Sequence, residues 1–261
     1  MKLLEKLKLP EMRDIDNLDA PEVTLLHADI IRKKPFLRRV YIDFYRQFTQ
    51  AVQEPEGKVL VEIGSGGGFI KEVIGNVITS EVIELPGIDM VFSALDMPFE
   101  ETSVDAFFMF DVLHHINEPR MFFAEAVRCL KEDGKIVMIE PANTPLSRYI
   151  YKNFHHEPFD ERAGWELEQT GRLSQANCAM PWIIFTRDRK IFEKEFPFLK
   201  IVKMRNHTPL RYLLSGGLTL RQLMPSFTYT PIKCIEYLLF PLNNLLGMFQ
   251  TIVLQKVADI R

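Results

Sequence analysis

Between Pro35 and Val52, apolar side chains recur every three or four residues, the spacing of one helix face. They are Phe36, Leu37, Val40, Tyr41, Phe44, Tyr45, Phe48 and Val52. Pro35 suits the first helical position, where its missing N–H costs no hydrogen bond. The pattern predicts an amphipathic helix ahead of the first strand.

Short apolar runs then alternate with stretches of helical spacing, which is typical of βαβ units. Strands are expected at 58–63, 77–81, 88–92, 104–110 and 135–140, and helices at 69–75 and 118–130. Because these runs are apolar on both faces, they favour a parallel sheet buried between two helix layers.

Beyond Pro141 the pattern weakens, although 187–196 is typical of a helix and 199–204 and 248–257 of strands that would complete the sheet. The segment 205–247 between those strands is too long for a hairpin loop. We therefore expect a single domain. Its parts are an N-terminal helical cap (1–55), an α/β core (56–204 and 248–261) and a lid or interaction insert (205–247).

The formal net charge is −3 and the pI is near 6.1, so the chain lacks the basic field that nucleic-acid binding usually needs. The three cysteines are widely separated and form no Cys-x-x-Cys pair, which favours a reducing compartment. The first fourteen residues lack the apolar core of a signal peptide, and polar residues and a proline interrupt the apolar stretch 234–254. We expect a cytoplasmic protein without a transmembrane helix.

The most informative motif is a strand that runs into a glycine-rich turn, Gly64-Ser65-Gly66-Gly67-Gly68. Glycines let a backbone approach a ligand closely, and free N–H groups at a helix start attract polar ligand groups. The dinucleotide pattern G-x-G-x-x-G needs a third glycine where this chain has Phe69. The turn therefore indicates a cofactor site but disfavours a pyrophosphate cradle.

With Glu62 two residues ahead of Gly64, the turn resembles motif I of class I methyltransferases dependent on S-adenosylmethionine (SAM). The stretches 93–99 and 103–106 resemble the adenine region of that family. The run 107–116, with Val112-Leu113-His114-His115, resembles motif IV of small-molecule methyltransferases related to ubiquinone biosynthesis. The resemblance spans about residues 59–141. It implies SAM as cofactor and a Rossmann-like, doubly wound, mostly parallel seven-stranded sheet.

The resemblance also implies roles for individual residues. An acidic group at the end of the second strand would accept hydrogen bonds from ribose hydroxyls, and Glu81 is the first candidate with Glu84 as its competitor. Ser93 stands in place of the family's acidic adenine contact, and Asp111 is expected near the methionine part of SAM. The expected cofactor-binding residues are Glu62, Gly64, Ser65, Gly66, Gly68, Glu81, Ser93, Ala94, Leu95 and Asp111.

Methyl transfer from a sulfonium is an in-line displacement that depends mainly on alignment and on exclusion of water. A hydroxyl acceptor would benefit from a general base, and histidine suits that role near neutral pH. His114 and His115 are the candidate catalytic residues, with His155 and His156 as further options; the first pair could instead cap a helix or pack. No metal is expected, because the Asp, Glu and His residues show no ligand spacing.

The acceptor is interpreted as a small or lipid-like molecule that is methylated on oxygen or carbon. The apolar insert would form its pocket first of all, or else a homodimer contact or a peripheral membrane patch. A cluster of basic residues could meet a phosphorylated acceptor or be a solvated helix face: Arg32, Lys33, Lys34, Arg38 and Arg39. The competing hypotheses are a SAM-binding partner protein without transferase activity and an NAD-dependent oxidoreductase.

Overall fold

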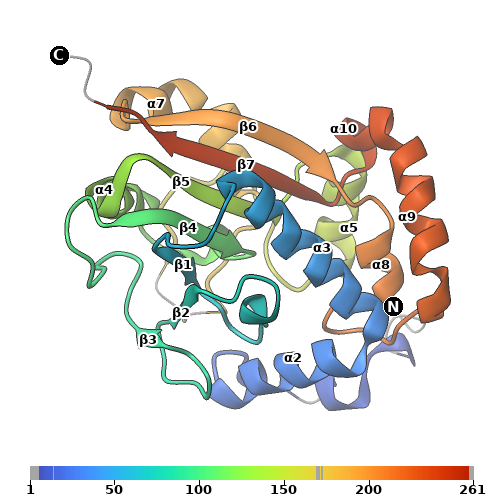
Figure 1. Ribbon diagram of the computed structural model, residues 1–261. Helices are drawn as coiled ribbons and strands as arrows, with labels where there is room; N and C mark the ends of the chain where they lie inside the picture. The colour runs from blue at the N-terminus through green and yellow to red at the C-terminus, as the bar shows by residue number, and fades with distance from the viewer. Residues whose placement is uncertain (1–5, 14, 169–170, 172, 259–261) are drawn as a thin grey trace.

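The computed structural model describes residues 6–13, 15–168, 171 and 173–258, and its centre is a seven-stranded sheet (Figure 1). The strand order is β3-β2-β1-β4-β5-β7-β6, and only β7 runs antiparallel to its neighbours. The strands are β1 (Leu60–Ile63), β2 (Val77–Glu81), β3 (Met90–Val91), β4 (Val104–Phe110), β5 (Leu130–Pro141), β6 (Leu199–His207) and β7 (Phe249–Lys256). This arrangement confirms the predicted doubly wound, mostly parallel seven-stranded fold.

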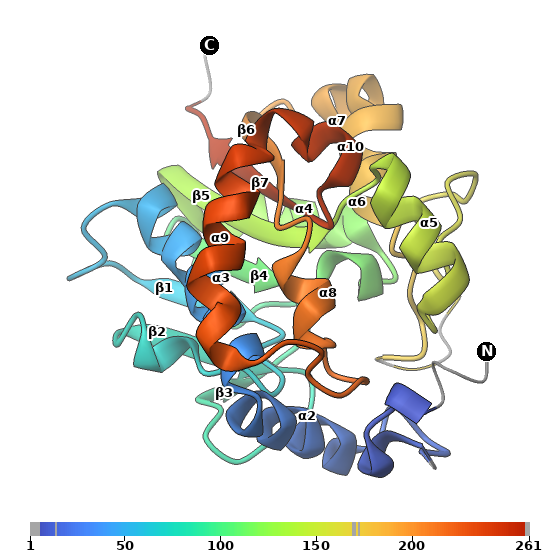
Figure 2. The ribbon, with the colours of Figure 1, turned by 90° about the vertical axis from the view of Figure 1, so that its right-hand side faces the viewer.

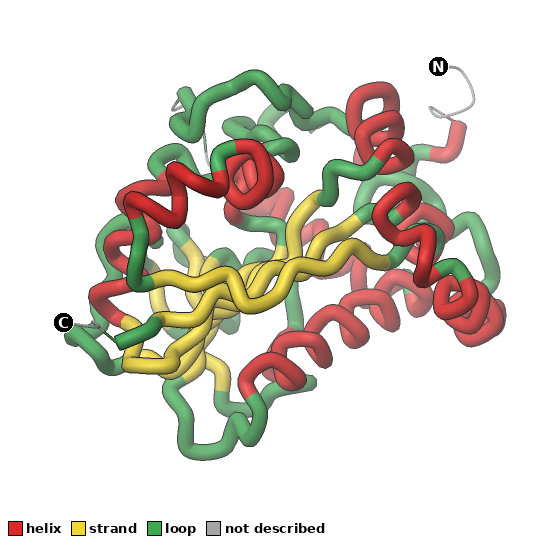
Figure 3. The backbone as a smooth tube through the Cα atoms, turned by 90° about the horizontal axis from the view of Figure 1, so that it is seen from above, coloured by secondary structure: helices red, strands yellow, loops and turns green. Residues whose placement is uncertain are grey.

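Helices cover both faces of the sheet, as the view from above shows (Figure 3). The α-helices are α2 (Pro21–Lys33), α3 (Pro35–Val52), α4 (Pro119–Cys129), α5 (Pro145–Phe154), α6 (Met180–Trp182), α7 (Arg189–Glu195), α8 (Arg211–Ser215), α9 (Tyr229–Leu238) and α10 (Asn243–Leu246). Shorter turns are η1 (Pro10–Met12), η2 (Ile70–Glu72), η3 (Leu113–His115), η5 (Ser226–Thr228) and η6 (Phe240–Leu242), and η4 (Ile183–Arg187) is a π-helical turn.

Each face of the sheet is closed by aromatic packing. On one face, Phe48 of α3 stacks on Phe108 of β4 with ring centroids 4.9 Å apart and ring planes 4° apart. On the other, Phe123 of α4 contacts Phe192 of α7 with ring centroids 5.2 Å apart. All four of these side chains are fully buried. The apolar stripe of α3 therefore packs on the sheet, as its spacing predicts.

The register of the central strands determines where the site forms. β1 lies between β2 and β4, with Glu62 opposite Thr79 on one side and Phe108 on the other. The parallel strands thus end along one edge, and the residues that follow them emerge together, which is where α/β sheets bind ligands.

One sequence-based element is wrong. The stretch 69–75 does not form a helix; it contains only the three-residue turn η2 before β2 begins at Val77. Gly75 and Asn76 end the segment within two turns of the glycine loop, so a regular helix has no room to develop. The glycine-rich turn consequently has no long helix behind it to present free N–H groups.

Other boundaries differ less. Strand β6 extends to His207, so the first residues of the expected insert 205–247 belong to the sheet. Helices α5, α6, α8, α9 and α10 were not expected from the pattern, and α2 was expected only as part of the helical cap. The first five residues of the predicted cap, together with 14 and 259–261, lie outside the described residues.

The N-terminal segment and the loop that follows α8, far apart in the sequence, lie side by side (Figure 2). Leu9 N–H donates to Thr219 O at 3.0 Å, and Arg221 N–H donates to Leu7 O at 2.8 Å. Lys34, which is only 6% exposed, donates its Nζ to the carbonyl oxygens of Gly217 and Leu220. The N-terminal cap and the insert thus form one roof, defined here as residues 6–13, 15–34 and 208–224.

A buried ion network fixes the insert to α3. The Arg211 guanidinium pairs with Asp43 and Glu236, and the Tyr229 hydroxyl donates to Asp43 Oδ2 at 2.7 Å. Burial opposes the charge of Arg211, but its carboxylate partners raise its pKa further above the ordinary value.

Among the described residues, no helix combines the length and the apolar character needed to cross a membrane.

Replacement of Phe48 by alanine should lower the free energy of unfolding by about 3–5 kcal/mol, because it empties a fully buried stacking position. Phe227→Ala, at a side chain that is 80% exposed, should change it by less than about 0.5 kcal/mol. Urea denaturation followed by circular dichroism measures both. Equal effects of the two substitutions would contradict the described packing of α3.

Candidate active site

A cavity of about 620 Å³ opens where β1, β2 and β4 end. Its floor contains the glycine-rich turn, Glu62 and the residues that follow β4. Its walls come from α2, α3, the residues after α5, and the insert. Cavities of this size commonly hold small molecules and cofactors.

The glycine-rich turn is pressed between neighbouring elements. Gly64 has φ +66°, and a Cβ added there would approach Val112 Cγ2 to 2.8 Å. A Cβ at Gly68 would come within 2.5 Å of the Tyr45 hydroxyl oxygen, which accepts a hydrogen bond from Phe69 N–H at 3.2 Å. Larger residues at Gly64 or Gly68 would therefore displace the turn after β4 or helix α3. Close approach of these elements explains why glycines stand at both positions.

Glu81, at the end of β2, reaches back to this turn. One carboxylate oxygen accepts from Gly66 N–H at 3.1 Å, and the other from Val82 N–H at 2.9 Å. The side chain is buried and lines the cavity, whereas Glu84 is exposed and lies outside the lining. The geometry therefore favours Glu81 over Glu84 as the acidic group at the β2 edge.

Glu62 is the second acidic group of the floor. It is 2% exposed, and its Oε2 has no hydrogen-bond partner among the described residues. Burial raises the pKa of Glu62 to about 8, with the nearby Glu81 carboxylate acting in the same direction. A buried oxygen without a partner in a cavity wall is a position where a ligand could donate a hydrogen bond.

The expected adenine region lies on the wall, but its details differ from the expectation. Ser93, Ala94 and Leu95 line the cavity, while Asp96 is exposed and lies outside the lining. Leu95 N–H, however, already donates to Ser93 Oγ at 3.2 Å. The backbone donor of Leu95 is thus used within the turn.

The two candidate catalytic histidines lie in different places. His115 lines the cavity, and its Nδ1 lies 2.9 Å from Gln175 O. Because a carbonyl oxygen can only accept, Nδ1 carries the proton and Nε2 of the neutral ring is unprotonated. Burial lowers the pKa of His115 to about 4, which leaves the ring neutral at physiological pH. His114 is fully buried behind the wall and does not line the cavity. Of this pair, only His115 is placed to meet an acceptor directly.

Asp111, the remaining expected residue, also lines the cavity and has an unusual backbone. Its φ is +62°, and its N–H donates to Ile139 O at 2.9 Å, which turns the chain sharply out of β4. Burial raises the pKa of Asp111 to about 7, although His114 opposes that shift. Its protonation at neutral pH will therefore respond to a charged ligand.

Two functional candidates were missed at the sequence level. Glu140, at the end of β5, is fully buried, and one of its oxygens lies 2.7 Å from His114 Nδ1. Glu157 lines the cavity, and imidazole nitrogens of four histidines lie 3.4–3.7 Å from its carboxylate: His114, His115, His155 and His156. The run His155-His156-Glu157 was the only available signal, because Glu140 reads as an ordinary strand residue.

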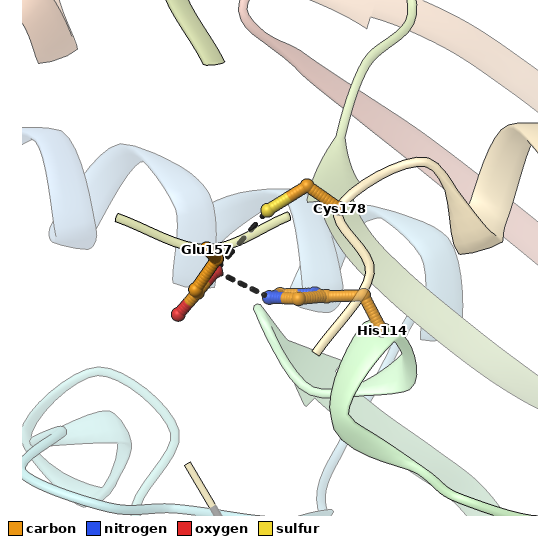
Figure 4. Close-up of side chains that lie close together, drawn as sticks. All are labelled: His114, Glu157 and Cys178. Atoms are coloured by element: carbon orange, nitrogen blue, oxygen red, sulfur yellow. Dashed lines mark hydrogen bonds and ion pairs between the residues drawn. The ribbon is translucent and has the colours of Figure 1, made fainter. Parts of the chain in front are cut away.

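These groups determine each other's charge. Burial opposes protonation of His114, but Glu140 and Glu157 outweigh it and raise its pKa well above the ordinary value. Burial would likewise raise the pKa of Glu157, and the histidines instead lower it well below its usual range. Two groups of potential ligating atoms result. One is His114 with Glu157 and Cys178 (Figure 4), and the other is His114 with Asp111 and Glu140.

The basic cluster expected at 32–39 does not form one surface. Lys33 pairs with Asp29, Arg38 pairs with Glu72, and Lys34 turns inward to the insert. Burial lowers the pKa of Lys34 to about 8. These local partners weaken the interpretation that the cluster meets a phosphorylated acceptor.

Comparison with known proteins identifies the family to which these motifs belong. Residues 61–138, which run from β1 to β5, match the family model described as methyltransferase domain. The chain therefore contains a methyltransferase domain over these residues. This confirms the predicted family and, with it, SAM as the cofactor. No curated protein sequence matches the chain at a significant level.

Solved structures agree with the methyltransferase fold. A SAM-dependent methyltransferase from Archaeoglobus fulgidus is 15% identical with a TM-score of 0.52, covering 84% of this chain and 94% of that one. The [4+2]-cyclase SpnF is 10% identical with a TM-score of 0.50, covering 84% of this chain and 81% of that one. At such low identities the likeness shows the fold and not the substrate.

Replacement of Glu62 by glutamine should make the methyltransferase relatively more stable as pH rises. The folded chain keeps a proton on Glu62 that the unfolded chain loses above about pH 4.5, so wild-type stability falls between about pH 4.5 and 8. The glutamine is neutral throughout. The difference in unfolding free energy should grow by about 2 kcal/mol between pH 5.5 and 7.5, since the limit is about 1.4 kcal/mol per pH unit.

Urea denaturation at both pH values, without cofactor, measures this difference. Glu84→Gln is the control, because that side chain is exposed and its substitution should show no such trend. A constant difference between wild type and Glu62→Gln would exclude a proton held at this position.

Proposed function

We propose that this methyltransferase transfers the methyl group of SAM to a small, mainly apolar acceptor, on oxygen or carbon, inside the roofed cavity. The observation that carries the proposal is the composition of the cavity wall. The glycine-rich turn and acidic residues form one side, and apolar residues of the insert form the other: Tyr212, Leu213, Leu218 and Leu223.

The residues on the cofactor side fit SAM. The close-packed glycine turn leaves space at the cavity floor, and Glu81 ends β2 where ribose hydroxyls would donate hydrogen bonds. Ser93 and Ala94 line the part of the wall where adenine would bind. The carboxyl groups of Asp111 and Glu62 line the cavity as well and would bind the ammonium group of the methionine part. When bound, SAM supplies an electrophilic methyl group on a sulfonium.

This chain's own residues would align and enclose the reactants. With a ligand bound, the roof would limit the access of water to the cavity. Alignment of reactants can contribute several kcal/mol, roughly 7–11 in the most favourable cases. The rings of Tyr41 and Tyr45 line the wall, and an aromatic face stabilises a neighbouring cation. His115, neutral and with Nε2 unprotonated, would accept the proton that a hydroxyl acceptor loses.

The exposed apolar side chains of the insert are separate from this cavity. Tyr237, Leu238 and Phe240 are more than half exposed and do not line it. They are therefore no part of the proposed acceptor wall, for which the insert contributes residues 212–223 instead.

The competing functions make different predictions. An NAD-dependent oxidoreductase would require a phosphate cradle at a helix start, and η2 is only three residues long. A SAM-binding partner protein would bind SAM yet release no S-adenosylhomocysteine with any acceptor. The cyclase that shares this fold illustrates why binding and turnover must be measured separately.

Replacement of Glu81 by alanine should weaken SAM and S-adenosylhomocysteine binding about tenfold or more, because hydrogen bonds to a carboxylate are lost. Glu84→Ala should change affinity less than about twofold, since Glu84 lies outside the cavity. Calorimetric titration measures both. Wild-type protein that is folded but binds neither ligand would overturn the proposed cofactor site.

Replacement of Leu218 by aspartate should raise the acceptor KM about tenfold or more, because a charge then lines the apolar wall. Leu238→Asp is the matched control, at a side chain that is 81% exposed and outside the lining, and should leave KM unchanged. Release of S-adenosylhomocysteine with a panel of phenolic, fatty and isoprenoid acceptors is the assay. SAM affinity should stay within about twofold in both variants, and an unchanged KM in Leu218→Asp would place the acceptor elsewhere.

A further inference from the structure

Three side chains with metal-ligating atoms converge at the inner wall of the cavity. They are His114 in η3, Glu157 after α5, and Cys178 before α6 (Figure 4). Nε2 of His114 lies 3.4 Å from Glu157 Oε2, and Cys178 Sγ lies 3.1 Å from the same oxygen. The ligating atoms all lie within 4.8 Å of one another, and His114 and Cys178 are buried.

The orientation of His114 is fixed by a second carboxylate. Glu140 Oε1 accepts from Val112 N–H at 2.9 Å and from Leu113 N–H at 2.8 Å, and Oε2 lies 2.7 Å from His114 Nδ1. An ionised Glu140 can only accept, so Nδ1 carries a proton and Nε2 is the nitrogen left to ligate. A histidine held by a carboxylate through its other nitrogen is the usual arrangement at metal sites.

Nε2 of His114 is the observation that most directly points to a ligand. It is fully buried, has no hydrogen-bond partner among the described residues, and is aimed at the carboxylate of Glu157. A lone pair and a carboxylate oxygen repel each other at this distance. A cation therefore belongs between them. The carboxylates that raise the pKa of His114 favour a proton there, and a metal ion would take the place of that proton.

The distances suit a metal ion. Bonds of about 2.0 Å to nitrogen or oxygen and about 2.3 Å to sulfur place tetrahedral ligands about 3.3–3.5 Å apart. The nitrogen–oxygen separation of 3.4 Å matches such an edge. The sulfur–oxygen separation of 3.1 Å, at which the Cys178 thiol donates a hydrogen bond to Glu157, is about 0.4 Å shorter than one. The local charge also favours a metal cation, because three carboxyl groups lie close together here: Asp111, Glu140 and Glu157. Among the described residues, Glu140 and Glu157 form ion pairs only with histidines.

We propose that His114, Glu157 and Cys178 bind one divalent transition-metal ion, with zinc the best match to the nitrogen, oxygen and sulfur ligands. A sulfur ligand disfavours magnesium and calcium, which take oxygen. Three protein ligands leave a fourth position open, as at catalytic zinc sites. Glu157 lines the cavity, so that position faces the acceptor side.

A metal ion here would also narrow the class of acceptor, and this consequence rests on the proposed function. An ion with its open position in the cavity would hold an acceptor through an oxygen or sulfur atom and stabilise its anionic form. The sequence offers no spacing signature for such a site, because its ligands come from three separate segments. The earlier expectation of no metal rested on that spacing.

Cobalt(II) alone, added to metal-free protein under reducing conditions, is the test. We expect one equivalent to bind and to give a thiolate-to-cobalt charge-transfer band in the near ultraviolet. Cys178→Ser should abolish the band. Cys234→Ser should retain it, because Cys234 is exposed and far from the site in the sequence.

The histidine ligand is tested in the same way by competition between cobalt and zinc. His114→Gln should weaken zinc binding about tenfold or more. His156→Gln should leave it within about twofold, although its imidazole lies 3.6 Å from the other oxygen of Glu157. Circular dichroism verifies that each variant is folded.

Three outcomes would overturn the proposal: no metal bound by folded wild-type protein, a charge-transfer band that persists in Cys178→Ser, or equal losses in the two histidine variants. In the first case a proton fills the place between His114 and Glu157. Calorimetric titration of SAM into the same samples separates a failed metal site from a failed cofactor site, because the metal assay contains no SAM.

Discussion

The buried carboxylate of Glu140 holds the active-site edge of the sheet together. It lies at the end of β5 and accepts hydrogen bonds from two backbone N–H groups of the turn that leaves β4. That turn contains Val112, which packs against Gly64, and the two histidines that follow. A buried carboxylate is costly unless its oxygens are satisfied, and here each oxygen has a donor. The position of the cavity floor therefore depends on this one side chain.

The second constraint is the fit between the glycine-rich turn and its neighbours. Only the three-residue turn η2 follows the glycine-rich turn, so contacts with the residues after β4 and with α3 determine its shape. Tyr45 contributes both its ring and its hydroxyl oxygen to that contact. The apolar stripe that attaches α3 to the sheet thus also shapes the cofactor cradle.

Periodicity and local motifs predicted most of the sheet, because strands and α3 bury continuous or regularly spaced apolar runs. The helix 69–75 failed because Gly75 and Asn76 end the segment before more than a short turn can form. Glu62, Glu81 and Asp111 could be predicted, since each immediately precedes or ends a motif at the edge of a strand. Glu140, Glu157 and Cys178 could not, since only the folded chain brings these segments together. Lys34 was misjudged for a similar reason, because its partners are carbonyl oxygens about 180 residues away.

The pairing of residues 7–9 with 219–221 has a consequence for the order of events in folding. Contacts between such distant segments carry a large loop-closure entropy and can form only after the sheet has brought both segments near. The roof is thus expected to form late in folding. Any molecule bound beneath it stabilises the closed form by mass action. Ligand affinity and the contact between the N-terminal segment and the insert are therefore one linked equilibrium.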